Sequence, residues 1–226
     1  MRVFHVIAID GPAASGKSSV ARALARRLGF AYVNSGALYR AVTWHILQRR
    51  VDVRDCAAVS AAIGQTQIVC DLSHGESRIC IGGIDPSPHL REDDVNYSVS
   101  LVSSVPRVRE ILGEQMRAYA RTHDVVMEGR DIGSVVFPDT PFKFYIDASP
   151  EVRVRRREAQ GGRDEIASRD RLDSSRETAP LVVAPDADVI DSSHVSVDEV
   201  VNRVLRRLAS KGLTEAKQPV LPEQGA

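Results

Sequence analysis

Cysteine and histidine are scarce in this 226-residue chain, and neither forms a recognisable pattern. The three cysteines, Cys56, Cys70 and Cys80, are odd in number, and no two of them have CxxC spacing. The six histidines are scattered and include no HExxH motif. These absences argue against a disulfide framework and against a zinc site. We expect reduced, mostly buried thiols instead.

Long apolar runs and an excess of one charge are also missing. No run of about 18 apolar residues occurs, and the N-terminal sequence MRVFHVIAIDG lacks the pattern of a signal peptide. The 30 basic residues balance the 30 acidic residues, which gives no support to a nucleic-acid partner or to a polybasic membrane contact. We therefore expect a cytoplasmic monomer that binds neither nucleic acid nor membrane.

Lysine is rare among the basic residues. It occurs only at Lys17, Lys143, Lys211 and Lys217, and all other basic residues are arginines. Compositional bias is the simpler explanation of this arginine excess. The functional explanation is planar, bidentate recognition of phosphate or carboxylate groups. One of the rare lysines, Lys17, stands at the end of a glycine-rich segment.

The chain alternates between strand-like and helix-like segments. The apolar runs predict strands over residues 3–9, 31–34, 124–129, 142–148 and 187–192. Helical periodicity and capping residues predict helices over residues 16–29, 36–50, 93–105 and 106–122, another that begins at Ser149–Pro150, and one that follows Ser196. This order predicts an α/β fold with a central parallel sheet covered by helices on both faces.

Residues 66–90 break this alternation. The segments TQIVCDL and SRICIGG alternate polar and apolar residues around SHGE, and two glycines and two prolines follow. This pattern is typical of a β-hairpin. We interpret the segment as an insertion that forms a small antiparallel subdomain.

A phosphate-binding loop follows the first predicted strand. Gly11, Gly16, Lys17 and Ser18 match the pattern G-x-x-x-x-G-K-[ST] without a gap, between an apolar strand and an amphipathic helix. In such a loop, backbone N–H groups and the helix N-terminus surround phosphate oxygens. Lysine reaches the β- and γ-phosphates, and the serine hydroxyl is a ligand for Mg²⁺. The predicted ATP-binding residues are Gly11, Pro12, Ala13, Ala14, Ser15, Gly16, Lys17, Ser18 and Ser19.

Two classes of nucleotide-binding protein share this loop. A guanine-nucleotide switch would carry DxxG and NKxD motifs, and neither occurs in the chain. A small-molecule kinase needs an acceptor site that faces the loop and cations that stabilise an anionic transition state. Four arginine-bearing segments meet that need: NSGALYR (34–40), PRVR (106–109), EGRDIGSVVFPD (128–139) and SRDRLDSSRETAPL (168–181).

In this order the four segments and the loop resemble the bacterial cytidylate kinases, P-loop nucleoside monophosphate kinases that transfer phosphate from ATP to CMP or dCMP. The resemblance covers about residues 3–210. It implies ATP with Mg²⁺ as the phosphate donor. It also implies a core of about 1–34, 104–150 and 180–211, an acceptor-binding region with the β insert over about 35–103, and a lid over about 151–175. We expect the tail 212–226 to be disordered.

The resemblance also implies residue roles. The acceptor site would consist of Ser35, Arg40, Ser100, Arg109, Arg130, Asp131, Arg169, Asp173 and Arg176. Arg40 and Arg130 would hold the CMP phosphate, Asp131 and Asp173 the sugar, and Ser100 and Arg109 the cytosine. Catalysis would rest on Lys17, Arg130 and Arg169, with Arg153 and Arg157 closing over ATP from a mobile lid helix bent at Gly161–Gly162.

The chain departs from the family pattern at two places. Asn34–Ser35 stands where the family often has a threonine before GALYR, and the hydroxyl is kept. The lid between Arg157 and Arg169 is shorter than in longer members. Two other readings stay open: a kinase of the same architecture that acts on UMP or a small metabolite alcohol, and a non-catalytic ATP-binding module.

Overall fold

The computed structural model describes residues 3–159, 161 and 166–213, without the side chain of Arg169. Its centre is a seven-stranded sheet with the order β3-β4-β2-β5-β1-β6-β7. The strands are β1 (Val6–Asp10), β2 (Ala31–Asn34), β3 (Ile68–Ser73), β4 (Glu76–Ile81), β5 (Val125–Gly129), β6 (Phe142–Asp147) and β7 (Asp188–Asp191). From β2 to β7, neighbouring strands run parallel. The predicted α/β class is confirmed.

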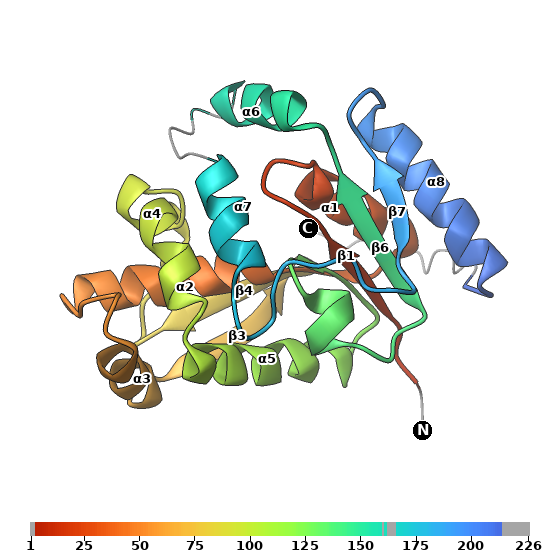
Figure 1. Cartoon of the computed structure of the whole chain (residues 1–226). Helices are drawn as coiled ribbons and strands as arrows, with labels where there is room; N and C mark the ends of the chain where they lie inside the picture. Colours follow the sequence, from red (N-terminus) through yellow and green to blue (C-terminus); the bar gives the residue numbers. More distant parts are fainter. Residues whose placement is uncertain (1–2, 160, 162–165, 214–226) are drawn as a thin grey trace, which may run out of the picture.

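Helices cover both faces of this sheet (Figure 1). They are α1 (Lys17–Leu28), α2 (Ser35–Gln48), α3 (Cys56–Gly64), α4 (Asp93–Val102), α5 (Pro106–Ala120), α6 (Pro150–Ala159), α7 (Ile166–Ser174) and α8 (Val197–Ser210), with a 3₁₀ turn η1 (Ser87–His89) and a π-helical turn η2 (Ile132–Val136). None of the helices within the described residues combines the length and apolar character that crossing a lipid bilayer requires.

Strand β1 explains why the sheet has two cores. Its side chains alternate between the faces, as the period of a strand requires. Ile7 and Ile9 belong to the cluster that α1 and α8 complete, whereas Val6 and Ala8 belong to the cluster that α2, α3, α4 and α5 complete. The strand is buried along its whole length, as a near-continuous apolar run in a parallel sheet predicts.

One predicted boundary and one omission need correction. Strand β1 begins at Val6 rather than at residue 3. Helix α3 was not expected, although Asp55 caps it by accepting hydrogen bonds from the N–H groups of Ala57 and Ala58 at 2.9 Å each. The predicted caps of two other helices are confirmed: Ser149 accepts from Val152, and Ser196 accepts from Glu199.

The hairpin is confirmed, but it does not form a separate sheet. Strands β3 and β4 pair antiparallel from Ile68–Ile81 to Ser73–Glu76. Strand β4 also joins the edge of the main sheet through one pair, Tyr32 and Glu76. The hairpin therefore extends the central sheet instead of standing apart as a small subdomain.

The charged segment after Ser149 also differs from the expectation of one bent helix. It forms two helices, α6 at the upper edge of Figure 1 and α7 below it, and both contact the phosphate loop. Gly162 of the predicted bend lies outside the described residues, as do residues 214–226 of the predicted disordered tail.

Candidate active site

A cleft of about 590 Å³ opens beyond the carboxyl ends of β2 and β5. Its walls come from the phosphate loop, from the first turns of α1 and α2, from α4, and from α6 and α7, the two helices of the segment expected to form a lid. Ligands of open parallel sheets bind at this edge of the sheet. The fold thus brings together segments that are more than a hundred residues apart in the sequence.

The phosphate loop has the backbone that its glycine pattern predicts. Gly11 has a φ of 151°, and a Cβ there would lie 2.1 Å from the carbonyl oxygen of Ile146, so only glycine fits. Helix α1 begins at Lys17 with no acidic residue in its first turn, which leaves the positive end of its dipole facing the loop. The buried Lys17 ammonium donates to the Pro12 carbonyl at 3.0 Å. The lysine therefore lies over the loop that would hold the phosphates.

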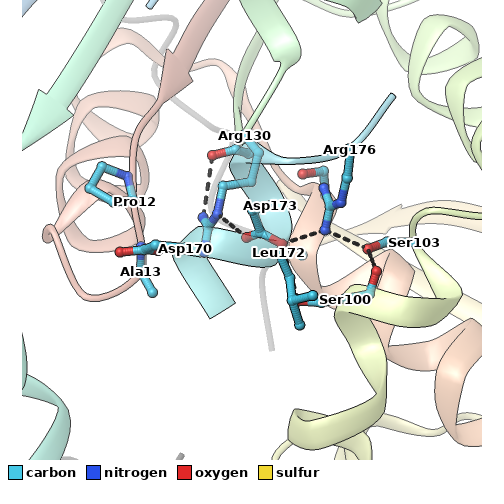
Figure 2. Close-up of polar contacts among 12 residues, drawn as sticks. Pro12, Ala13, Ser100, Ser103, Arg130, Asp170, Leu172, Asp173 and Arg176 are labelled. Atoms are coloured by element: carbon cyan, nitrogen blue, oxygen red, sulfur yellow. Dashed lines mark hydrogen bonds and ion pairs between the residues drawn. The ribbon is translucent and has the colours of Figure 1, made fainter. Parts of the chain in front are cut away.

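Lid residues contact the outer side of this loop. Asp170 of α7 accepts a hydrogen bond from the Ala13 N–H at 3.1 Å and pairs with Arg153 of α6, and Figure 2 shows Asp170 beside Ala13. Arg156 donates to the Ser15 carbonyl at 3.3 Å and to the Ser192 carbonyl at 2.7 Å. The loop is thus held from the lid side as well as from the sheet.

One side of the cleft is built around the carboxylate of Asp173 (Figure 2). Arg130 donates to it through Nε at 2.9 Å, Ser100 donates to it at 3.1 Å, and Arg176 pairs with it from one helical turn away. Asp173 is only 3% exposed. Burial lowers the pKa of Arg176, and the charge of Asp173 opposes that effect. The buried carboxylate therefore holds two guanidinium groups in place at the cleft.

Asp131 and Arg109 form a second buried pair behind this wall. Burial raises the pKa of Asp131, and the Arg109 guanidinium opposes the rise. Arg109 also donates to the Ser103 carbonyl at 3.0 Å and lies 5.4 Å from the centre of the Tyr39 ring. Asp131 lines the cleft, whereas Arg109 does not. Arg109 therefore holds Asp131 and the end of α4 in place.

The first turn of α2 supplies the opposite wall. Asn34 caps this helix by accepting from the Ala37 N–H at 2.9 Å. Ser35 donates to the Glu128 carbonyl at 2.7 Å, and Arg40 donates to the Gly36 carbonyl at 3.1 Å. Both side chains line the cleft. The predicted NSGALYR segment is thus anchored to the end of β5.

Two residues that line the cleft, Arg156 and Glu128, and one that contacts the phosphate loop, Asp170, are among those that the sequence did not predict. Arg156 and Asp170 look like ordinary members of a charged run, and only the docking of the lid on the loop distinguishes them. Glu128 lies one residue before the end of β5, is 3% exposed and accepts from the Tyr32 hydroxyl at 3.0 Å. A carboxylate near the end of the strand beside the loop-bearing strand is a signal that sequence reasoning could have used.

Most of the predicted site residues lie together. Those that line the cleft are Ala13, Ala14, Gly16, Lys17, Ser18, Ser19, Ser35, Arg40, Ser100, Arg130, Asp131, Arg157, Asp173 and Arg176. Gly11, Pro12 and Ser15 complete the loop without lining the cleft, and Arg109 and Arg153 lie behind it. Arg169 is in α7, but its side chain lies outside the described residues. The contacts of its guanidinium therefore stay a prediction.

Comparison with known proteins adds the family. A sequence model of the family described as cytidylate kinase matches residues 7–210. A cytidylate kinase from Pelotomaculum thermopropionicum is 44% identical over 223 residues, which cover 93% of this chain and 98% of that protein. Cytidylate kinases from Mycobacterium leprae and Geobacillus kaustophilus are 42% and 44% identical, and each alignment covers 88% of this chain and more than nine-tenths of the relative. The chain belongs to the cytidylate kinase family.

Proposed function

We propose that this protein transfers the γ-phosphoryl group of ATP to CMP or dCMP, which gives ADP and CDP or dCDP. One observation carries the proposal: a single cleft has the phosphate loop on one side and the Arg130–Asp173–Arg176 cluster on the other. The loop suits the donor triphosphate, and the arginine cluster suits a second phosphate-bearing ligand. The family membership favours a cytidine nucleotide as that ligand.

The donor would bind with its phosphates in the loop of residues 11–19. The N-terminus of α1 and the Lys17 ammonium offer positive charge there. The Ser18 hydroxyl and the Glu128 carboxylate line the same cleft, and such hard oxygen donors fit Mg²⁺. Mg²⁺ held there would offset the negative charge of the donor phosphates during transfer.

The acceptor would bind with its phosphate at Arg130 and Arg40 and its sugar at Asp131 and Asp173. A guanidinium has five N–H donors, so Arg130 can bond Asp173 and still grip a phosphate oxygen. Ser100 would face the cytosine edge, where O2 and N3 are acceptors. Uracil carries N3–H instead, and a donor facing a buried donor costs about 1–3 kcal/mol. Arg109, which the resemblance implies as a second base contact, lies behind the cleft and pairs with Asp131, so it would support this side of the site from behind.

No strong general base is needed for this transfer, because the acceptor phosphate is already an anion at neutral pH. The protein's contribution is alignment and charge stabilisation. We assign the lid to residues 151–175, between the core segments at about 104–150 and 180–211, and the acceptor-binding region to residues 35–103. Arg153, Arg157 and Arg169 of this lid would surround the transferring group and exclude water when it closes.

The runner-up function is the same chemistry with another acceptor, such as UMP or a small metabolite alcohol. A more distant alternative is an ATP-binding module without transfer. The buried cation cluster facing the loop disfavours the second alternative, since a module that only binds ATP has no use for it.

The test is Asp173→Ala, with each nucleotide titrated separately by calorimetry. Loss of Asp173 leaves Arg130 and Arg176 close together without their shared counter-ion. We expect CMP affinity to fall by about 10²-fold, as removal of one member of a buried charge pair implies, and ATP affinity to stay within about twofold. Asp55→Ala, which removes only the cap of α3, is the matched control. Equal losses of CMP and ATP would refute the assignment of this cluster to the acceptor.

A further inference from the structure

Asp10 is a buried carboxylate that the proposed reaction does not use. It is the last residue of β1, immediately before the phosphate loop, and it is 5% exposed. Its two oxygens accept hydrogen bonds from two successive backbone N–H groups, those of Ile132 at 2.8 Å and Gly133 at 2.7 Å. Burial raises its pKa to about 6, and these two bonds oppose the rise. Burying a carboxylate costs free energy, so its presence at this place calls for an explanation.

The two partners of this contact differ in how firmly the fold holds them. Strand β1 is paired on both sides, with β5 and β6, and both ladders include Asp10. Ile132 and Gly133 instead begin η2, a short π-helical turn with no side-chain cap from its own preceding residue, Asp131. The first N–H groups of such a turn lack partners within the turn. Asp10 accepts the hydrogen bonds of these N–H groups from another segment. Because β1 is paired on both sides, the strand holds the start of η2 in place and not the reverse.

The segment that Asp10 fixes carries the proposed acceptor contacts. Arg130 and Asp131 directly precede Ile132, and both line the cleft. Asp131 adopts an irregular backbone, with φ −148° and ψ 22°, so the ladder of β5 no longer dictates its direction. The orientation of these two residues relative to the phosphate loop therefore depends on what holds the start of η2.

We propose that Asp10 is a positioning residue for phosphoryl transfer: by bonding the start of η2 to the strand that carries the phosphate loop, it sets the position of Arg130 and Asp131 relative to the donor. The inference rests on the proposed acceptor role of these two residues. Rates of aligned reactions respond strongly to small displacements, and a shift of about 1 Å can cost about 10²-fold. Asp10 would thus act on transfer without touching either substrate.

Asp10→Asn tests this role. The amide keeps the shape of the side chain but places an NH₂ donor against one of the two N–H groups, so one bond is lost and a repulsion replaces it. We expect the CMP dissociation constant to rise about tenfold and kcat to fall about 10- to 100-fold. The ATP dissociation constant should stay within about twofold of the wild-type value. The phosphate loop follows β1 directly, and the substitution leaves the pairing of β1 with β5 and β6 intact. Calorimetric titration of each nucleotide and steady-state kinetics give the three values.

The matched control is Asp55→Asn. Asp55 also accepts from two successive backbone N–H groups, those of Ala57 and Ala58, but it is exposed at the start of α3. This variant should keep wild-type constants for both nucleotides. Should Asp10→Asn fail to fold, Gly133→Ala displaces the same segment from its other side, since a Cβ there would meet Lys143 at 3.1 Å. It should weaken CMP more than ATP as well.

The outcomes separate the two proposals. A folded Asp10→Asn protein that binds CMP as the wild type does, or that loses CMP and ATP equally, would overturn the positioning role. A wild-type protein that fails to bind CMP at all would instead overturn the proposed function. A selective loss of CMP binding together with a lowered kcat supports both.

Discussion

Lys17 is the side chain on which we expect donor binding to depend most. It is buried at the start of α1 and lies over the loop through its bond to Pro12. In Lys17→Ala, the charge that should meet the β- and γ-phosphates is gone, and we expect kcat/KM to fall by at least about 10²–10³-fold, as for other lost transition-state donors. Lys211→Ala is the control, since Lys211 pairs with Asp188 away from the cleft. Near-normal turnover of folded Lys17→Ala would contradict the loop assignment.

The ionisation of Asp10 gives a pH-dependent stability. Its pKa is about 6 in the folded protein, where burial and the charge of Asp131 raise it and Lys17 lowers it, against 3.8 for the ordinary group. Between these pH values the folded state holds more protons than the unfolded state, so the free energy of unfolding falls as pH rises. As the pH rises from below 4 to above 6, the free energy of unfolding of the wild type should therefore fall by on the order of 3 kcal/mol relative to that of Asp10→Asn.

Urea unfolding of the wild type and of Asp10→Asn at several pH values measures the difference between their free energies of unfolding. The contributions of the other titrating groups largely cancel in this difference. A difference that stays constant between pH 4 and pH 7 would show that Asp10 does not titrate in this range.

At the scale of single residues, local motifs could be predicted from the sequence, whereas contacts between residues far apart in the sequence could not. Gly11 to Ser19 form the predicted loop because their backbone geometry is set by neighbours in the sequence. Arg156 and Asp170 contact this loop only because α6 and α7 fold back over it. No periodicity in the charged run marks these two among its other arginines and aspartates. Their roles follow from tertiary packing alone.

Among the elements, the missed ones have weak local signals. Helix α3 is rich in alanine, and its apolar residues do not define one face clearly. The capping residue Asp55 is therefore the main sequence signal for this helix. The hairpin was recognised from its alternation, whereas its junction with β2 rests on one pair, Tyr32 and Glu76. Periodicity within a segment carries no information about which edge that segment will join. The buried strand β1, apart from its start, and the amphipathic helix α8 were predicted from their patterns.

The junction of β5 with α2 offers a test at the scale of elements. A Cβ on Gly129 would lie 2.6 Å from the Ser35 hydroxyl and 2.8 Å from the Ile132 side chain. Gly129→Ala therefore must push apart the end of β5 and the first turn of α2, and we expect a loss of about 1–3 kcal/mol in the free energy of unfolding. Urea denaturation monitored by circular dichroism measures this loss.

Gly113→Ala is the matched control for this substitution. Gly113 lies within α5, and a Cβ there would meet only the flexible end of Arg117 at 3.4 Å. Alanine in a helix interior is favoured over glycine by about 1 kcal/mol, so this variant should be as stable as the wild type or more stable. If Gly129→Ala proved equally stable, the close approach of β5 and α2 would be wrong.

For the whole molecule, the edges of the sheet favour a monomer. The edge strand β7 has four residues and carries an aspartate at each end, which discourages pairing with another chain. Its exposed Val189 is a single apolar residue, and isolated exposed residues of this kind are normal on protein surfaces. We expect light scattering after size exclusion to give the monomer mass of 24.7 kDa. A mass near twice that value would contradict this expectation.

The most direct measurement is an ADP-release assay with ATP and Mg²⁺ against CMP, dCMP, UMP, AMP and GMP. The cleft unites a phosphate loop with the Arg130–Asp173–Arg176 cluster, and the account predicts strong turnover with CMP and dCMP and little with the other three. Turnover with UMP alone, or with none of the five, would leave the phosphate loop in place and contradict the assignment of the arginine cluster to a cytidine nucleotide.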